Sequence, residues 1–505
     1  MSVIEKKQGA LSRMVHPVRL DAPIRTSLAR GGVFSTIGLV AQGLLRFATS
    51  FLIGHIAGKA ELGVVASAIA TSLTLALLWP TTTGSAASKF LARARGADNR
   101  EESLATAAHL RMRTIQTGLF LGAVSLPIWI VIDHGSWVDA ISVAALTIAY
   151  SGYSFTRGVQ FGAGQIQRAT SWDVTSVVIG LAGLVVLLLA GIRGPALVLP
   201  LVVTYGLYTL AGWPYSGSGR PDRARRRELD GFVMLGAIGS LASTGFLQLS
   251  QIAAKVSGGN ANAGQYAAAL NLATPASLLA VSLSLVLLPS MSEAWGRTDR
   301  TEFHAQTDRA TRALAVVMVA IFGTIIACSR LIVAVIWGAR FAGAEDILPV
   351  LVLAVLATNL GVASVNALTT QSQRNMLITV ASSITGMVIG GGLWFWFGPK
   401  FGVEGVALGY LCGTVVISGI PVVVVWRQGR HKWRMLFGKV AVGLAVVGAM
   451  ALVQRLFTLP PLLDPAFAVV FLAAWWALNR AEFAKLPIPG LRGRARASRG
   501  MNYKA

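Results

Sequence analysis

The feature that most constrains this chain is a ladder of about fourteen apolar segments, with lysine and arginine concentrated in alternate gaps between them. A segment of roughly 20 predominantly apolar residues is long enough to cross a bilayer as a helix. Lysine and arginine collect in loops that stay on the cytoplasmic side. The pattern therefore predicts an all-α polytopic membrane protein of about fourteen transmembrane helices, with little mass outside the bilayer.

The composition agrees with this prediction. Of the 505 residues, 54% are hydrophobic and 13% are charged, whereas soluble domains carry about 25% charged residues. The net charge of +23 would also suit nucleic-acid binding. Because the positive charge is spread over gaps between apolar segments, topology explains it better, and we expect no nucleic-acid partner. Cys328 and Cys412 lie far apart inside apolar segments, so we expect neither a disulfide nor a metal site.

The apolar segments also predict the topology. The spans are expected at 32–56, 62–88, 110–132, 138–161, 172–191, 195–213, 231–254, 264–289, 313–337, 346–370, 376–397, 402–425, 437–457 and 464–479. Basic residues gather at 93–100, 220–227, 297–309 and 427–434, and the opposite gaps hold few. An even number of spans then places both termini in the cytoplasm, and we expect a bacterial cytoplasmic (inner) membrane.

Two similar halves divide the chain. Residues 63–71 recur as 264–274 with two extra residues, and Gln165-Ile-Gln-Arg168 recurs as Gln371-Ser-Gln-Arg374. Chance similarity between Ala-rich strings is the alternative. Six spans separate the copies, which predicts parallel repeats with the transport site between them. The predicted divisions are a basic N-terminal tail (1–30), a six-helix lobe (31–213), a basic linker (214–230), a second six-helix lobe (231–425), two additional transmembrane helices (436–480) and a basic tail (481–505).

Several short motifs resemble those of a known family. They are Leu45-Arg46-Phe47, Gly54 to Gly63, Gly264 to Leu270 followed by Leu288 to Glu293, and Gly402 to Gly409. Over residues 30–430 the chain resembles the polysaccharide-export flippases of the multidrug/oligosaccharidyl-lipid/polysaccharide exporter superfamily. The resemblance implies two lobes around a central cavity, alternating access, and movement of an isoprenoid diphosphate-linked sugar to the outer leaflet. Many members carry an acidic residue near positions 248–251, which this chain lacks.

Polar residues inside spans are the candidate ligands, since they are expensive in a bilayer. Arg46 lies in the first span with Gln42 four residues before it and Ser50 four after, on one helical face. An arginine there can hold a diphosphate through its forked donors. Alternatively, Arg46 is structural, satisfied by backbone carbonyls, or reaches a membrane interface.

Two further polar stripes are expected to face the cavity and meet sugar hydroxyls. Thr244, Gln248 and Gln251 follow one another at helical spacing in the seventh span, and Asn359 and Asn366 do so in the tenth. The alternative is that these side chains join packed helices. Lys255, beyond the first stripe, is expected at a membrane interface.

Prolines and acids complete the pattern. Pro80 and Pro275 interrupt the second and eighth spans at comparable places, which predicts helix breaks that serve as hinges. Acidic residues, Asp173 among them, are expected only at span ends. The lack of a deep carboxylate disfavours a cation-coupled drug exporter and suits an anionic substrate.

Three functions compete at this stage. The first is a flippase for a prenyl diphosphate-linked oligosaccharide, with membrane lipids around it and a polysaccharide polymerase or glycosyltransferase machinery as candidate partners. The second is an exporter of small amphipathic compounds on the same fold. The third, a membrane glycosyltransferase or acyltransferase, is disfavoured because the outer loops are short. We therefore expect a transporter rather than an enzyme, without a cofactor; no Walker motif is present.

Overall fold

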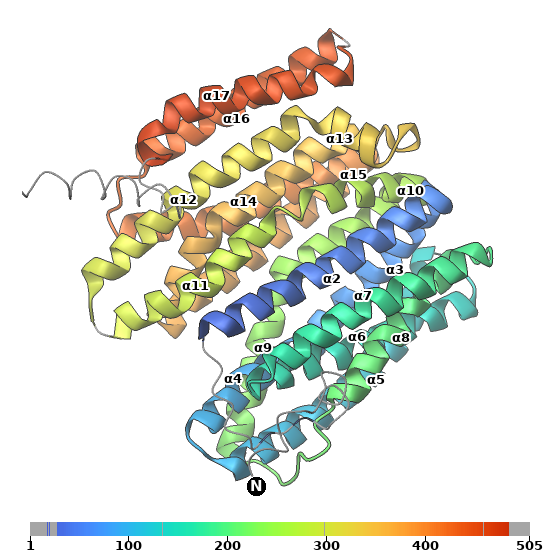
Figure 1. The fold of residues 1–505 in the computed structure, drawn as a ribbon, viewed down its shortest axis with the longest axis vertical. Coiled ribbons are helices and arrows are strands. Elements are labelled where there is room, and N and C mark those ends of the chain that lie inside the picture. Colours follow the sequence, from blue (N-terminus) through green and yellow to red (C-terminus); the bar gives the residue numbers. More distant parts are fainter. Residues whose placement is uncertain are drawn as a thin grey trace, which may run out of the picture.

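The protein is a bundle of long helices that run side by side (Figure 1). The structure, a computed structural model, describes residues 18, 20, 28–133, 135–296, 298–457 and 459–483, and it has no strand among them. Most of the two predicted basic tails lies outside these residues. The predicted all-α class is confirmed.

The helices fall into three groups along the chain. The first is α2 (Leu28–Ile56), α3 (Lys59–Leu77), α4 (Pro80–Gly96), α5 (Arg100–Asp133), α6 (Trp137–Gly162), α7 (Ile166–Leu189), η2 (Gly194–Val198) and α8 (Leu199–Gly212). The second is α9 (Arg223–Ser240), η3 (Leu241–Gly245), α10 (Phe246–Ala273), α11 (Ser277–Gly296), α12 (Arg300–Ala327), α13 (Ser329–Ile336), η4 (Ala339–Phe341), α14 (Ala344–Gln371) and α15 (Gln373–Gln428). The third is α16 (Arg434–Leu456), η5 (Pro461–Leu463) and α17 (Asp464–Phe483). We call the first two groups the N-lobe and the C-lobe.

Glycines explain how fourteen crossings arise. Twelve helical stretches of the described residues are long and apolar enough to cross a membrane. Two of them double back, at Gly259 with φ +70° and at Gly402 with φ +55°. Only glycine adopts such positive φ values without a steric penalty. Each of the two therefore contributes two crossings, and the total is the predicted fourteen.

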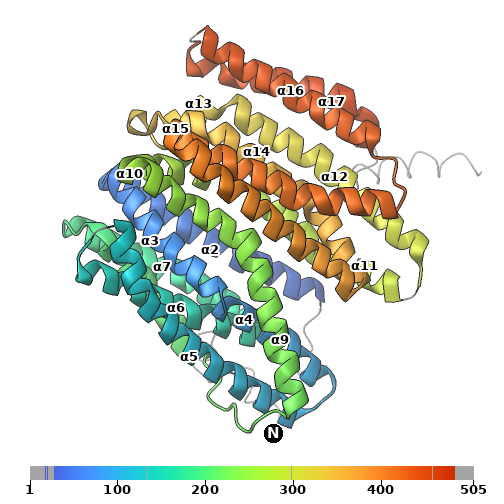
Figure 2. The same ribbon diagram turned by 180° about the vertical axis from the view of Figure 1, so that it is seen from behind.

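Most of the basic residues near the turns lie at one end of the bundle. At this end, which we call the basic end, α4 and α15 finish and α5, α9, α12 and α16 begin. Residues 223–230, predicted as part of a linker, are the first turns of α9. Their acids tie α9 to the N-lobe, because Asp230 pairs with Arg113 of α5 and Glu228 pairs with Arg93 of α4. Figure 2 shows α9 descending beside α4 and α5.

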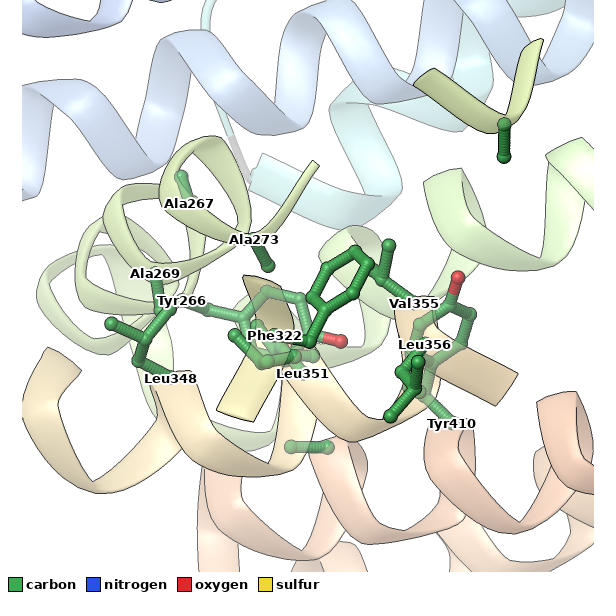
Figure 3. Packing of buried hydrophobic residues seen from close by; sticks show 14 of the residues in the cluster. Tyr266, Ala267, Ala269, Ala273, Phe322, Leu348, Leu351, Val355, Leu356 and Tyr410 are labelled. Atoms are coloured by element: carbon green, nitrogen blue, oxygen red, sulfur yellow. The ribbon is translucent and has the colours of Figure 1, made fainter. Parts of the chain in front are cut away.

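Small side chains let the helices approach closely. In the C-lobe, Ala269 and Ala273 of α10 lie in one buried cluster with Leu348 and Leu351 of α14 (Figure 3). Lipid is as apolar as leucine, so close packing rather than hydrophobic transfer holds such helices together. Large apolar side chains point outward instead; Phe395 is 85% exposed.

The additional helices α16 and α17 lie along the outside of the C-lobe (Figure 1). Trp475 of α17 donates to the carbonyl of Val316 in α12 at 2.9 Å. Asp464, fully buried at the start of α17, accepts from the guanidinium of Arg330 in α13 at 2.6 Å. These polar contacts fix the pair on α12 and α13, away from the boundary between the lobes.

The predicted breaks at the two prolines are present. The second crossing is interrupted between the end of α3 at Leu77 and the start of α4 at Pro80. The eighth is interrupted between Ala273 and Ser277, with Pro275 in the gap. Proline lacks a backbone N–H and clashes with the preceding turn, so each break follows from the residue itself.

Candidate functional site

A cavity of about 500 Å³ lies between the lobes, and Gln42 and Arg46 of the first span line it. It is lined by Leu39, Gln42, Gly43, Arg46, Thr81, Gly84, Ser85, Ser88, Tyr150, Tyr153, Ser154, Arg157, Gly158, Phe161 and Leu278. All belong to α2, α4 and α6 of the N-lobe except Leu278, which belongs to α11. The cavity occupies the half of the bundle towards the basic end, since it extends along α4 to Ser88 and along α6 to Phe161.

Arg46 extends from α2 into this cavity. Its Nη2 donates to the hydroxyl of Tyr150 at 3.4 Å, and its guanidinium carbon lies 5.9 Å from the centre of the same ring. It forms no ion pair with any carboxylate of the described residues. A cation whose partners are neutral tyrosines keeps its charge available to an anion.

Arg157 supplies a second guanidinium, and its partner corrects an expectation. Asp173, expected at a span end, lies inside α7 and is fully buried. Its Oδ2 accepts from Arg157 Nε at 3.1 Å, and its Oδ1 accepts from the Tyr153 hydroxyl at 3.1 Å. The sequence pattern gave no sign of this depth, because the polar Trp172-Asp173 pair follows a short loop that looks like an interface. The cavity wall thus contains two arginines, and a buried carboxylate outside the lining neutralises one of them.

Four tyrosines support this wall, and sequence reasoning missed them. Tyr150 and Tyr153 of α6 pack against Tyr205 and Tyr208 of α8, with ring centres 4.6–5.8 Å apart. Half of the eight tyrosines of the chain are in this cluster. The signal was the repeated i, i+3 spacing in two neighbouring spans, which places each pair on one helical face.

Three buried polar atoms on the cavity wall have no hydrogen-bond partner among the described residues. They are Gln42 Oε1, Thr81 Oγ1 and Arg157 Nη2. Most buried polar atoms in proteins are hydrogen-bonded, so unpaired ones gathered around one cavity indicate a place for a polar ligand or water. The hydroxyls of Ser85, Ser88 and Ser154 add further donors and acceptors.

The predicted C-lobe ligands are placed differently from the N-lobe ones. Gln251 donates to the carbonyl of Ala263 at 3.1 Å, Asn359 donates to Ser277 Oγ at 3.1 Å, and Asn366 donates to Ser284 Oγ at 2.8 Å. The two asparagine bonds join α14 to α11, and the Gln251 bond joins the two halves of α10 on either side of Gly259. None of the three lines the cavity in this conformation.

The stripe in the seventh span is also broken. Residues 241–245 form a turn of π-helix, which contains Thr244. A π turn has more residues than an α turn, so the residues before it are rotated relative to Gln248 and Gln251. Thr244 is exposed and Gln248 is half-buried, and neither lines the cavity. Ser50, one turn beyond Arg46 on α2, does not line it either.

The opposite end of the lobe boundary is closed. A Cβ atom on Gly63 of α3 would overlap the Asn260 carbonyl, and one on Gly264 would overlap the Lys59 carbonyl. Lys255, expected at a membrane interface, is buried there with its Nζ 4.5 Å from the ring centre of Trp129 in α5. The lobes therefore meet tightly at this end and enclose a polar cavity nearer the basic end. No cluster of metal ligands occurs among the described residues.

Comparisons with known proteins identify a family of membrane transporters. A family model described as lipid II flippase MurJ matches residues 140–474, about two thirds of the chain. A solved structure of lipid II flippase MurJ in an inward closed conformation has a TM-score of 0.68 at 14% identity, covering 89% of this chain and 99% of that chain. No curated protein sequence matches.

Two transporters of the MOP superfamily share the fold. A multidrug resistance MATE family transporter in an inward-facing conformation has a TM-score of 0.65 at 14% identity, covering 80% of this chain and 99% of that chain. A transporter from Pyrococcus furiosus, described as having a binding pocket of reverse polarity, has a TM-score of 0.59 at 15% identity, covering 81% and 96%. At these identities the likeness concerns the fold.

Proposed function

Because the chain belongs to the lipid II flippase MurJ family, and is therefore a multi-pass membrane transporter and not an enzyme, we propose that it flips a prenyl diphosphate-linked oligosaccharide across the membrane. In this proposal the headgroup enters from the basic end, which faces the cytoplasm, and leaves at the opposite end. The membrane is the bacterial inner membrane. The substrate is a precursor of a cell-wall glycan or exopolysaccharide.

The observation that carries the proposal is the pair of arginines on one cavity wall, of which only Arg157 is paired with a carboxylate. Arg157 is neutralised by Asp173, whereas Arg46 forms no ion pair among the described residues and has neutral tyrosines as partners instead. The cavity wall therefore keeps one net positive charge. A diphosphate offers oxygens to a guanidinium fork, and such charge-assisted bonds are roughly twice as strong as neutral ones. Arg46 would hold the diphosphate, with Gln42 beside it.

The rest of the substrate would be divided between the cavity and the bilayer. The hydroxyls of Thr81, Ser85, Ser88 and Ser154 suit sugar hydroxyls, which both donate and accept hydrogen bonds. Next to the cavity, α2 exposes Val40 and Leu44, which suit contact with the prenyl tail in the bilayer. In a later state, Gln248 and the C-lobe amides Gln251, Asn359 and Asn366 would exchange their present contacts for sugar contacts.

Alternating access would come from relative movement of the lobes. The present state is closed at the end where Gly63 meets Gly264, so export requires that contact to open. The helix breaks at Pro80 and Pro275 lie where the second and eighth crossings bend, and we propose that they act as hinges. Pro80 begins α4, and Pro275 lies between α10 and α11.

A second candidate is an exporter of small amphipathic compounds. Asp173 favours it, since a buried carboxylate beside a cavity is what cation coupling commonly uses. The ion pair with Arg157 weighs against it, because the carboxylate is already neutralised by a protein cation. We therefore place the flippase first.

The test is a depletion experiment in the source cells. Loss of the protein should cause a prenyl diphosphate oligosaccharide to build up in the inner leaflet, and wild type should relieve it. Arg46→Ala should not relieve it, Arg46→Lys should relieve it in part because it keeps only the charge, and Arg193→Ala is the control, since Arg193 is an exposed arginine at the opposite end. If no such lipid accumulates and depleted cells instead become sensitive to amphipathic cations, the exporter is the correct function.

A further inference from the structure

A second large cavity lies outside the transport path, at the basic end between the C-lobe and the additional helices. Its volume is about 1010 Å³, and it is lined by Arg312, Val423, Trp426, Arg427, Arg430, His431, Lys432, Arg434, Met435, Leu436, Lys439 and Glu482. The lining comes from the end of α15, the start of α16, the loop between them, α12 and the end of α17. None of these residues lines the cavity that contains Arg46.

The charge of this cavity is unbalanced. Arg312 is neutralised by Asp308 at 2.8 Å and by Glu482 at 3.1 Å, and Glu482 is the single acid of the lining. The other five cations form no ion pair with any described carboxylate; they are Arg427, Arg430, Lys432, Arg434 and Lys439. Five positive side chains around one concavity repel one another unless an anion lies between them.

Buried aromatic residues pack beside the loop that lines this cavity. The ring of His431 stacks on Trp433 with ring centres 4.5 Å apart and planes 4° apart, and its side chain is only 6% exposed. Its Nε2 is buried without a hydrogen-bond partner among the described residues. Trp426 donates from its indole to the His431 carbonyl at 2.7 Å, and Trp433 donates to Asp308 at 2.7 Å. The loop that holds the cations is thereby fixed by buried aromatic residues rather than free in solvent.

The walls of the cavity continue onto a lipid-facing surface. Val423, about one turn before Trp426 on α15, is 42% exposed, and Met435, at the start of α16, is 75% exposed. Tryptophan is enriched where hydrocarbon meets the headgroup layer, so Trp426 marks the depth of the headgroups. A ligand in the cavity can therefore keep a charged group among the cations and an apolar part on the neighbouring bilayer.

We propose that this cavity binds the phosphate-bearing headgroup of an anionic membrane phospholipid, whose acyl chains lie on the apolar faces of α15 and α16. A membrane lipid fits better than an acidic peptide, because the exposed wall is apolar and at headgroup depth. The bound lipid fills the space between α16 and α17 and the C-lobe and neutralises the loop at residues 427–434. This site is independent of the proposed substrate.

The experiment is a lipid titration of the purified, delipidated full chain in detergent, read by native mass spectrometry. The probes are phosphatidylglycerol and, as the uncharged comparison, phosphatidylcholine. The cavity variant is Arg430→Gln/Lys432→Gln/Arg434→Gln. The control is Arg223→Gln/Arg226→Gln/Arg227→Gln, which removes the same charge from exposed positions on α9. Equal melting temperatures of the three lipid-free proteins establish that the variants fold.

Wild type and the α9 variant should retain phosphatidylglycerol in preference to phosphatidylcholine. The cavity variant should bind phosphatidylglycerol roughly tenfold or more weakly, because basic side chains next to a headgroup are the main source of such selectivity. Equal loss in both variants would mean diffuse attraction to the basic end and would overturn the proposal. So would displacement of the lipid by equimolar inorganic phosphate or by an acidic peptide, since the site would then recognise those anions instead.

Discussion

Gly63 of α3 and Gly264 of α10 face each other across the lobe boundary, each against the backbone of the other's helix. The contact is reciprocal: Gly63 lies against Asn260 and Gly264 against Lys59. The two glycines begin the two copies of the repeat found in the sequence. A pseudo-two-fold axis therefore passes close to this contact, and the closed end of the transporter is formed by corresponding elements of both halves.

Replacing either glycine by alanine should open this end. Gly63→Ala forces a methyl group into the Asn260 carbonyl, and overpacking of this kind costs about 1–3 kcal/mol. The cost falls only on the closed state, so the ratio of open to closed molecules should rise about tenfold or more. Spin labels at Ile56 and Asn262, in a chain without Cys328 and Cys412, would report a longer distance.

Gly206→Ala is the matched control for this prediction. Gly206 is in α8, and a Cβ atom there meets nothing within 4 Å. In Gly206→Ala, the distribution of distances between the labels at Ile56 and Asn262 should equal that of the parent chain. An unchanged distribution in Gly63→Ala would show that the glycine contact does not determine which end is open.

The tyrosine that holds Arg46 should affect substrate affinity. Tyr150→Phe removes the hydroxyl that accepts from Arg46 and keeps the ring below the guanidinium. A hydrogen bond of this kind is worth about 1 kcal/mol, so KM for transport in vesicles should rise about fivefold. Tyr150→Leu also removes the ring and should raise KM further. Tyr215→Phe, at an exposed tyrosine outside the cavity, is the control and should leave KM unchanged. A fall in KM for Tyr150→Phe would mean that Tyr150 competes with the substrate for Arg46.

The sequence predicted the fold better than the site, for a physical reason. Spans, their number and the breaks at Pro80 and Pro275 follow from properties of single segments, namely apolar length and a missing N–H. The role of a polar side chain depends on which neighbour it meets. Arg46 and Gln42 do line the cavity, whereas Asn359 finds Ser277 within its own lobe, and no property of residue 359 alone distinguishes the two outcomes.

The position of Asp173 was also not predictable from the sequence. Its distance from the end of the apolar segment suggested a span end, but α7 begins earlier, at Ile166, and carries the carboxylate inward. Thr244 was predicted to face the cavity, but the π-helical turn at residues 241–245 rotates it away from Gln248 and Gln251. A helical period of 3.6 residues cannot predict such a turn, because the turn changes the period. Long-range contacts and local departures from 3.6 residues per turn are therefore what sequence analysis missed here.

The Arg157–Asp173 pair should be important for stability. Asp173→Asn leaves Arg157 largely buried without its counter-charge, and breaking a buried ion pair costs about 3–5 kcal/mol. The double variant Arg157→Met/Asp173→Asn should be less destabilised than the two single changes added together, because no unpaired charge remains. Unfolding midpoints in detergent measure the effect.

The control for this prediction is an exposed pair in the same chain. Asp346 and Arg455 pair at the opposite end, with side chains 42% and 49% exposed. Asp346→Asn should change the free energy of unfolding by less than about 1 kcal/mol. Equal effects at both pairs would mean that burial does not govern the contribution of Asp173.

His431 should make the stability of the basic end depend on pH. Burial lowers the pKa of His431 below its ordinary value of 6.5; His304 and Arg312 act in the same direction, and Asp308, with its Oδ1 3.9 Å from Nδ1, opposes them. The folded state therefore favours the neutral ring, and the unfolded state binds the proton more readily. Stability from this group is present above about pH 6.5 and is lost as the pH falls through the pKa of the folded state. Melting temperatures of wild type should fall between about pH 7 and about pH 5, the range in which histidine titrates.

His431→Gln should reduce that fall, and His55→Gln, at an exposed histidine of the opposite end, should not. Bound phosphatidylglycerol should also reduce it, because an anion beside the ring stabilises the protonated form; an undiminished fall in His431→Gln would assign the pH dependence to another group.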